Sequence, residues 1–321
     1  MGRVVVVGSF NVDHVWRVAE LPRPGETLSG EYRTGPGGKG FNQATAAARA
    51  GAATAFVCAL GEDAGGQLAR ALATADGIDL RDLPGRAPTG TAGIYVGGDG
   101  RNSIVIGPGA NAELSPAFVE GQGDAVAAAG AVLAQLESPV AAVETAFRLA
   151  RAAGATTLLN PAPADALAPA SLLALADIVT PNESEFAAQL RRHAGEAVAA
   201  EALGQLDDDA LHAHCRRLLP HGTVVVTLGA QGCFVSHAGV CLRGDAHARY
   251  RVPAAPVRAV DTTGAGDAFN GALAASLALR PHAAFVEHVR YANRYAGLST
   301  ERPGAAAAMP RDAEVRARFG G

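Results

Sequence analysis

The chain has 321 residues, enough for one large α/β domain or two smaller ones, and 49% of them are hydrophobic, with alanine supplying much of that share. The formal net charge of −4 gives no electrostatic argument for binding nucleic acid or an anionic membrane. No stretch contains the roughly 20 apolar residues of a membrane-spanning helix, and the opening run MGRVVVVGS is too short for a secretory signal. We therefore expect a soluble cytoplasmic protein without nucleic-acid or membrane partners.

The cysteines are Cys58, Cys215, Cys233 and Cys241, and they contain no CxxC pair. A CxxC pair would suggest a redox or metal site. We expect reduced, mostly buried thiols instead, as in a cytosolic protein.

The first sixty residues alternate between predicted strands and a helix. Residues 3–9 form a β-branched run closed by glycine, which predicts a buried strand. Residues 11–18 and 26–33 alternate partly between apolar and polar side chains, so we expect strands with one solvent-facing side. Residues 37–52 form a glycine turn that leads into a helix, and residues 54–61 predict another strand.

A hairpin follows, and after it predicted helices and strands alternate regularly. Residues 93–98 and 102–107 flank a Gly-Asp-Gly turn, which predicts two antiparallel strands. Ser-Pro at the start of residues 115–129 indicates the beginning of a helix. Residues 131–137 predict a strand and residues 139–154 a helix.

The second half continues the alternation. Strands are expected over residues 155–161, 176–182 and 222–229, with helical sequence between the last two. The polar, acidic stretch 191–210 is expected to be a solvated excursion without a function. Three helices close the chain, over residues 264–279, 281–298 and 311–318.

Strands that alternate with helices predict an α/β fold, with a mostly parallel central sheet flanked by helices on both faces. The partly polar early strands and the hairpin break this pattern. We interpret them as a small second sheet inserted into the main domain.

Polar or glycine-rich segments follow several predicted strands: GSFNVD, QLES, NPAP, TPNESE, TLGAQG and DTTGAGD. Ligands of open parallel sheets bind at the carboxyl ends of the strands. So many polar junctions are better explained by a ligand site at this edge than by stability.

The segment DTTGAGDAFNGAL, residues 261–273, combines a glycine turn with the start of a helix. Glycines let backbone amides converge, and a helix N-terminus adds unpaired donors, so the pair predicts an anion site. Asp267 has two interpretations: an N-cap or first-turn residue of the helix, or a base that accepts the proton of a hydroxyl attacking a phosphoryl group held by the amides. Neither a Walker loop nor a dinucleotide-binding fingerprint is present.

These motifs resemble those of the ribokinase-type sugar kinases of the PfkB carbohydrate kinase group. The similarity covers nearly the whole chain, because the motifs occur in the family's order: GSFNVD, PGET, GGKGFNQA, GAN, QLES, NPAP, TPNESE, TLGAQG and DTTGAGDAFNGAL. GGKGFNQA and DTTGAGDAFNGAL are highly specific, whereas TLGAQG alone would be weak. The resemblance implies a ribokinase-like fold in a single domain spanning residues 1–321.

The resemblance implies that Asp267 is the general base and that the amides of Gly264, Ala265 and Gly266 hold the transferring phosphate. The implied sugar-binding residues are Asn11, Asp13, Gly38, Lys39, Gly40, Asn42, Glu137 and Asp267. Two alternatives stay open from the residues themselves: Asn11 and Asp13 suit a turn, and Glu137 suits a buried structural carboxylate.

The resemblance also implies ATP as the phosphoryl donor. The implied nucleotide-binding residues are Asn182, Thr227, Gly229, Gly232, Gly266 and Asn293, and Glu185 would bind Mg²⁺ through water. Asn182 and Glu185 also have the spacing of a helix capping box. Asn293 lies in a predicted helix, where an asparagine is often simply a surface residue.

A monovalent cation, usually K⁺, is a further implication of the resemblance. The matching positions are Asp261, Thr263, Ser299, Arg302 and Gly304. The family often has serine where this chain has Ala308, so one side-chain oxygen is missing and the strength of activation by potassium is open.

The expected activity is the ATP-dependent phosphorylation of D-ribose at O5. A lid of segments 11–36 and 90–107 would cover the sugar, and the resemblance implies a homodimer formed through this lid. The alternatives are a kinase for fructose, a deoxysugar acid or a nucleoside, and a non-catalytic sugar- or nucleotide-binding protein.

Overall fold

A nine-stranded sheet forms the centre of the computed structural model, which describes residues 2–166, 168–240 and 242–320. Its strands, in spatial order, are β13 (Arg249–Val252), β12 (Cys233–His237), β11 (Thr223–Thr227), β10 (Ile178–Val179), β9 (Thr156–Leu159), β8 (Ala131–Ala134), β1 (Arg3–Val7), β4 (Ala53–Leu60) and β5 (Asp79–Pro84). From β11 to β5 all neighbours pair in parallel, whereas β12 and β13 are antiparallel.

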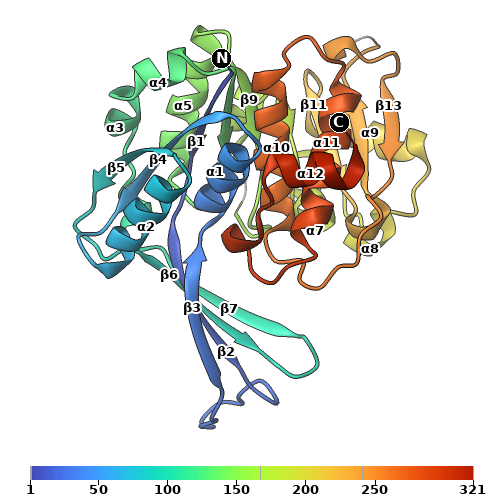
Figure 1. Ribbon diagram of the computed structural model, residues 1–321. Coiled ribbons are helices and arrows are strands. Elements are labelled where there is room, and N and C mark those ends of the chain that lie inside the picture. The colour runs from blue at the N-terminus through green and yellow to red at the C-terminus, as the bar shows by residue number, and fades with distance from the viewer. Residues whose placement is uncertain (1, 167, 241, 321) are drawn as a thin grey trace.

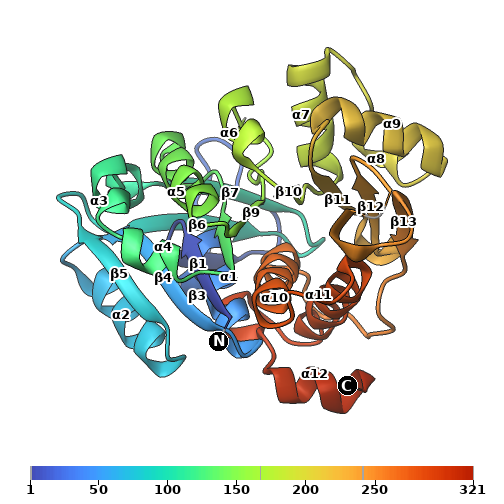
Figure 2. The ribbon, with the colours of Figure 1, turned by 90° about the horizontal axis from the view of Figure 1, so that it is seen from above.

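Helices cover both faces of this sheet (Figures 1 and 2). One face carries α1 (Lys39–Arg49), α2 (Ala64–Ala75), α10 (Ala265–Leu279), α11 (Phe285–Ser299) and α12 (Asp312–Phe319). The other carries α3 (Pro116–Glu120), α4 (Gly123–Ala127), α5 (Val140–Ala152), α6 (Ala170–Leu175), α7 (Glu183–Ala194), α8 (Ala200–Leu203) and α9 (Asp208–Leu218). Successive valines of β1 alternate between the two cores, with Val4 and Val6 in one and Val5 and Val7 in the other.

In the described part of the chain, short 3₁₀ helices shape four of the connections. They are η1 (Gly109–Glu113), η2 (Gly229–Gln231), η3 (Leu242–Gly244) and η4 (Ala306–Ala308).

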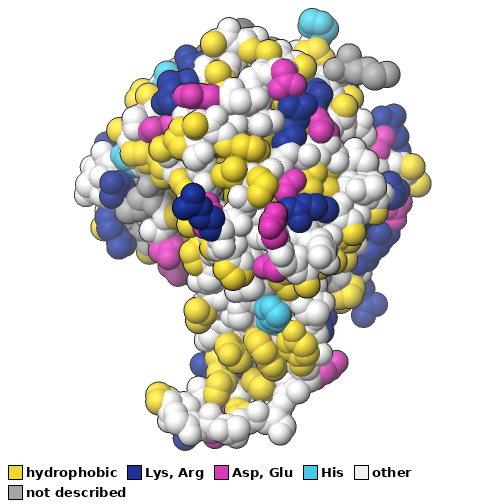
Figure 3. All heavy atoms as spheres, turned by 90° about the vertical axis from the view of Figure 1, so that its left-hand side faces the viewer, with side chains coloured by type: hydrophobic (Ala, Val, Ile, Leu, Met, Phe, Trp, Pro, Cys, Tyr) yellow, Lys and Arg dark blue, Asp and Glu magenta, His cyan; other side chains and the backbone are white. Residues whose placement is uncertain are grey.

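A second, four-stranded sheet projects from the body (Figure 1, bottom). Its order is β3 (Glu31–Gly37), β2 (Asn11–Arg17), β6 (Gly90–Val96) and β7 (Asn102–Gly107). Trp16 packs against Tyr32 and Tyr95, with ring centroids 5.2 Å apart in each pair. Figure 3 shows hydrophobic side chains gathered on this projecting sheet.

The predicted fold class is confirmed: the central sheet is mostly parallel, helices flank both faces, and a small second sheet is present. One strand was predicted in the wrong place, since residues 31–37 rather than 26–33 form β3. This strand contains Pro36, which the sheet tolerates because β3 lies at its edge.

Other elements differ from the prediction. The single helix expected over residues 115–129 is two short helices, separated at Gly121 and Gln122. The pair α2 and β5 was not predicted, nor were the antiparallel strands β12 and β13. The excursion 191–210 contains the end of α7 and all of α8.

The thiols of Cys58, Cys215 and Cys233 are buried and free, as expected, and Cys241 lies outside the described residues. Within the described parts of the chain, no helix is both long enough and apolar enough to cross a bilayer.

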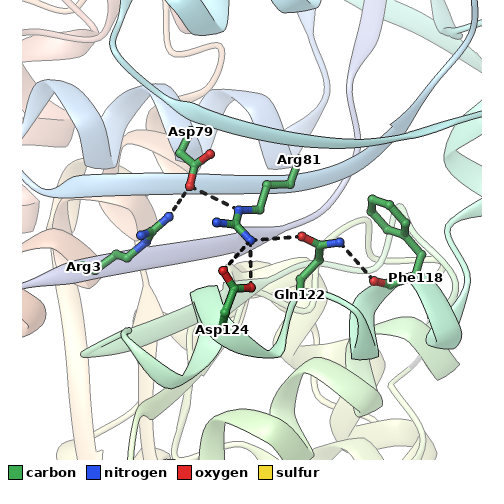
Figure 4. Close-up of polar contacts among 6 residues, drawn as sticks. All are labelled: Arg3, Asp79, Arg81, Phe118, Gln122 and Asp124. Carbon is green, nitrogen blue, oxygen red and sulfur yellow. Dashed lines mark hydrogen bonds and ion pairs between the residues drawn. The ribbon is translucent and has the colours of Figure 1, made fainter.

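Arginines join β1, β5 and α4 at one edge of the body (Figure 4). Arg81 binds Asp79 and Asp124, with an Nη1–Oδ1 distance of 2.9 Å to Asp124, and also the Gln122 side chain. Arg3 pairs with the same Asp79. Because both aspartates are exposed, these pairs contribute little stability, and this cluster is a minor feature of the fold.

Close packing of α1 against α10 depends on Gly271. A Cβ atom there would lie 2.4 Å from the Gln43 carbonyl oxygen and 2.5 Å from Ala46 Cβ. Both distances are far inside contact, so the two helices can approach this closely only with glycine at this position.

We predict that Gly271→Ala lowers the free energy of unfolding by about 1–3 kcal/mol, because the added methyl group forces α1 and α10 apart. Thermal unfolding measures this loss. The matched control is Gly123→Ala in α4, where a Cβ meets nothing within 4 Å and stability should stay equal or rise slightly. Equal stabilities of the two variants would contradict the packing argument.

Candidate active site

The carboxyl ends of β9, β10 and β11 and the N-termini of α1 and α10 surround a cleft of about 160 Å³. Its lining includes Lys39, Asn182, Glu185, Thr227 and the segment from Gly264 to Asp267. With Asn160 of NPAP, the structure therefore brings together residues from five of the motifs that the sequence singled out, at the predicted edge of the sheet.

Asp267 lies in the first turn of α10, with only 7% of its surface exposed. Its carboxylate does not cap the helix, whose N-cap is Gly264. Instead Oδ2 accepts a hydrogen bond from Asn42 Nδ2 and Oδ1 one from Gln43 Nε2, both at 2.9 Å. Asp267 is therefore a first-turn residue, as its structural alternative allowed, but not the N-cap, and two amides of α1 fix the orientation of its carboxylate.

Burial raises the pKa of Asp267, against the opposing effects of the Lys39 charge and the Asn42 and Gln43 amides. Burial alone would lower the pKa of Lys39, but the negative charges of Asp267, Glu137 and Glu185 outweigh it and raise that pKa. The site thus holds a buried carboxylate with increased basicity beside a fully charged ammonium group.

Further side-chain amides extend from Gln43. Its Nε2 also donates to Asn160 Oδ1 at 3.0 Å, and its Oε1 accepts from Gln135 Nε2. Asn160 donates in turn to the Thr180 carbonyl oxygen at 3.1 Å. This network ties Asp267 to the ends of β8, β9 and β10.

The glycine turn before α10 has the geometry of an anion site. Gly264 has φ of +75°, and a Cβ at Gly266 would meet nothing within 4 Å, so the backbone lies open to the cleft. Among the described residues, the amides of Gly264 and Gly266 have no acceptor. The Ala265 amide differs, because it donates to the Thr262 carbonyl oxygen at 3.1 Å.

The glycines around Lys39 allow α1 to start close to β1. Gly38 has φ of +87°, and a Cβ at Gly40 would lie 2.5 Å from the Ser9 amide nitrogen. The Lys39 amide donates to Glu137 Oε2 at 3.0 Å, and the Ser9 hydroxyl donates to the same oxygen at 2.6 Å. Glu137 is therefore hydrogen-bonded within the protein, as its structural alternative required, and lies beside Lys39.

Asn11 and Asp13 lie in strand β2, so the turn interpretation is wrong for them. Asn11 is buried, with 3% of its surface exposed. Burial, then the nearby charges of Glu137 and Asp267, raise the pKa of Asp13 to about 7. The Asp13 carboxyl group packs against the backbone of Gly37, where a Cβ would lie 2.2 Å from each of its oxygens.

Asn182 and Glu185 form a capping box at the start of α7. Asn182 Oδ1 accepts from the Glu185 amide at 2.9 Å, while Glu185 Oε2 accepts from the Asn182 amide at 2.9 Å. Both residues also line the cleft, as does Thr227. Burial raises the pKa of Glu185. The capping interpretation of this motif is confirmed, and the same two residues line the cleft.

The other predicted nucleotide residues lie outside the cleft lining. Gly229 and Gly232 form the turn between β11 and β12, with φ of +52° and +87°. Asn293 lines a separate hollow with residues 252–256, and its Nδ2 donates to the Pro253 carbonyl oxygen at 2.9 Å.

The predicted cation residues gather behind the glycine turn. Asp261 accepts from the amides of Thr263 and Gly304, each at 2.9 Å. The Ser299 carbonyl oxygen accepts from the Arg302 amide at 3.4 Å, and the Arg302 side chain points to Glu314. The two chain segments are thus in contact, with Ala308 buried in η4 nearby in sequence.

Sequence reasoning missed several residues of the site. Gln43, Asn160, Thr180, Thr262 and Asn270 lie at the cleft or bind Asp267 directly. All five belong to the motifs quoted above, so the motifs were found but the roles of these positions were not. A buried amide becomes informative only when its partner is known.

Comparisons with known proteins agree with this geometry. The family model described as pfkB family carbohydrate kinase matches residues 1–312. The ribokinase of Haemophilus influenzae is 38% identical over 313 residues, which cover 96% of this chain and 95% of that protein.

Solved structures give the same result. The ribokinase of Giardia lamblia has a TM-score of 0.85 at 29% identity and covers 99% of this chain and 98% of its own. The Arabidopsis thaliana ribokinase, solved in complex with ribose and ATP, has a TM-score of 0.82 at 33% identity, with 98% of each chain covered. The chain therefore belongs to the pfkB family of carbohydrate kinases, which confirms the family and the enzyme class expected from its motifs.

Proposed function

We propose that this kinase transfers the γ-phosphoryl group of ATP to O5 of D-ribose, giving D-ribose 5-phosphate and ADP. The observation that carries the proposal is the position of Asp267, a buried carboxylate directly after a turn whose Gly264 and Gly266 amides have no acceptor in the described part of the chain. The complex of a related ribokinase with ribose and ATP supports the choice of substrates.

Asp267 would act as general base. It accepts the proton of the sugar hydroxyl while the hydroxyl oxygen attacks the γ-phosphorus, and the bond between this phosphorus and the ADP oxygen breaks. The raised pKa of Asp267 suits this task, because a more basic carboxylate accepts the proton more readily. Gln43 and Asn42 keep the carboxylate aligned until the sugar binds.

The amides of Gly264 and Gly266 would stabilise the charge on the transferring phosphoryl group. Ala265 contributes less as a donor than expected, since its amide is already bonded to Thr262. Lys39 adds a full positive charge at the cleft, where water exclusion strengthens its effect.

Sugar hydroxyls would be held by residues at the start of β2, at the start of α1 and after β8. These are Asn11, Asp13, Gly38, Lys39, Gly40, Asn42 and Glu137. Asn42 already bonds Asp267, so a sugar hydroxyl placed between them would exchange one hydrogen bond for two.

The nucleotide would extend along the cleft from Gly266 past Asn182 and Thr227, toward Gly229, Gly232 and Asn293. Glu185 fits Mg²⁺ bound through water rather than directly, because both of its oxygens accept hydrogen bonds from Asn182. When bound, the ion supplies positive charge for the phosphates.

A potassium ion would lie behind the anion site, among Asp261, Thr263, Ser299, Arg302 and Gly304. The proposal is supported by the contact between the two chain segments, in which Asp261 accepts hydrogen bonds from the Thr263 and Gly304 amides. The ion would then support the turn that carries the Gly264 and Gly266 amides.

We also propose that residues 1–321 form one ribokinase-like domain, in which segments 11–36 and 90–107 are a lid over the sugar. Apolar residues of the small sheet are exposed, with Val105 at 69% and Tyr32 at 51%. A contiguous apolar surface exposed in this way is typical of a protein–protein contact. A second copy that pairs through the lids would cover it.

For the base, we expect Asp267→Asn to lower kcat by about 100-fold or more. The side chain remains buried and of similar size, so the Kd for ATP, measured by calorimetry, should change little. Turnover near that of the unchanged protein would remove the role of base from Asp267.

For the cation, Ala308→Ser should lower the potassium concentration for half-maximal activity several-fold, since it adds the missing oxygen in a buried position. Steady-state rates in potassium and sodium salts measure the effect, and Ala307→Ser, at an exposed position of the same 3₁₀ helix, is the control. Identical rates in both salts for all three proteins would exclude the cation site.

For assembly, Val105→Glu should convert the dimer into a monomer, because a charge would be buried between the lids. Analytical ultracentrifugation measures the mass. Val240→Glu, at a position with 68% exposure outside the small sheet, should leave the dimer intact. A dimer that survives Val105→Glu would rule out pairing through this surface.

A further inference from the structure

The four strands of the small sheet meet the body at one place, which we call the root: Asn11, Gly37, Gly90 and Gly107. Asn11 is the first residue of β2, and it pairs with Gly37 of β3 and Gly90 of β6. Asn11 is also one of the proposed sugar-binding residues, so the root of the small sheet and the sugar site share a side chain.

Asn111 in η1 forms hydrogen bonds to the chain at this root. Its Oδ1 accepts from the Phe10 amide at 3.0 Å, and its Nδ2 donates to the Phe10 carbonyl oxygen at 2.9 Å. The same Nδ2 donates its second proton to Asn11 Oδ1 at 2.8 Å. Asn111 is 2% exposed, so water does not replace these bonds.

These bonds determine which way both amides face. The Phe10 backbone offers one donor and one acceptor, and only one orientation of the Asn111 amide satisfies both. The remaining proton of Asn111 then requires an oxygen, which Asn11 supplies. Asn11 Nδ2 must therefore face away from Asn111, and it has no acceptor among the described residues.

Because Gly90 has no side chain, the two amides can lie side by side against its backbone. A Cβ at this position would lie 2.2 Å from Asn111 Nδ2 and 2.3 Å from Asn11 Oδ1. The two amides are therefore packed against the bare backbone of Gly90, where a side chain would displace them.

We propose that Asn111 is a positioning residue that determines sugar affinity, because it forces Asn11 to present N–H donors to the substrate. Asn11 then donates hydrogen bonds to hydroxyl oxygens, while the neighbouring Asp13 accepts hydrogen bonds from hydroxyl groups. This polarity suits adjacent hydroxyl groups of a sugar. This inference rests on the proposed function, through the assignment of Asn11 to the sugar site.

The test is Asn111→Asp, which keeps the shape of the side chain but removes both donors. Asn11 would then turn its N–H groups toward the new carboxylate and its oxygen toward the sugar. We expect the KM for D-ribose to rise about 10-fold or more, with the KM for ATP within about two-fold of its original value. Steady-state kinetics and the temperature of unfolding are measured together.

A double-mutant cycle separates orientation from general damage. In an Asn11→Ala background, Asn111→Asp should change the KM for D-ribose by less than about two-fold, because the amide through which it acts is gone. The matched control is Thr89→Ala at the same end of β6, which removes the hydrogen bond that the Thr89 hydroxyl donates to Asp63 and the one that it accepts from the Gly61 amide. It should lower the unfolding temperature and leave the KM for D-ribose unchanged.

An unchanged KM for D-ribose in Asn111→Asp, or a fully additive cycle, would overturn the proposal. If Asn111→Asp does not fold, Asn111→Ala, which introduces no charge, carries the same test with the same expected direction. Failure of the unaltered protein to phosphorylate any sugar would instead refute the proposed function, so the two failures are distinct.

Discussion

The candidate site depends on the close packing of α1 against α10, which Gly271 permits. Because no side chain separates the helices there, Gln43 and Asn42 reach both oxygens of Asp267. A carboxylate buried without partners would be very costly. The amides reduce this cost while leaving the pKa of Asp267 raised by burial. Packing between two helices thus determines the basicity and the direction of the proposed base.

Directional hydrogen bonding extends the same principle to the sugar side. The backbone of Phe10 orients Asn111, and Asn111 orients Asn11. On the other side of the cleft, Gln135 and Asn160 orient Gln43. In the first place Asn111 determines which atoms of Asn11 face the proposed sugar site, and in the second the oriented Gln43 holds the carboxylate of Asp267. Preorganisation of this kind lowers the cost of aligning the reacting groups.

The sequence predicted the layers of the fold, because β-branched runs and glycine junctions alternate with helical segments. It also predicted the edge of the sheet at which Asp267, Lys39 and Glu185 meet. The prediction was wrong for β3, because Pro36 is unusual in a strand and is tolerated here only at the edge of the sheet. It was also wrong for the helix expected over residues 115–129, which is split at Gly121. The roles of Gln43 and Asn111 were beyond it, because their partners lie more than 90 residues away in the chain and only tertiary packing brings them together.

The most direct test of the proposed activity is to identify the product. The protein would be incubated with ATP, magnesium and D-ribose, with ADP release followed by a coupled assay and the product analysed by phosphorus NMR. Fructose, a deoxysugar acid and a nucleoside serve as competing substrates. We predict ADP release that requires D-ribose and yields a phosphate ester on O5. Release that is independent of sugar, or a preference for another member of the panel, would contradict the account.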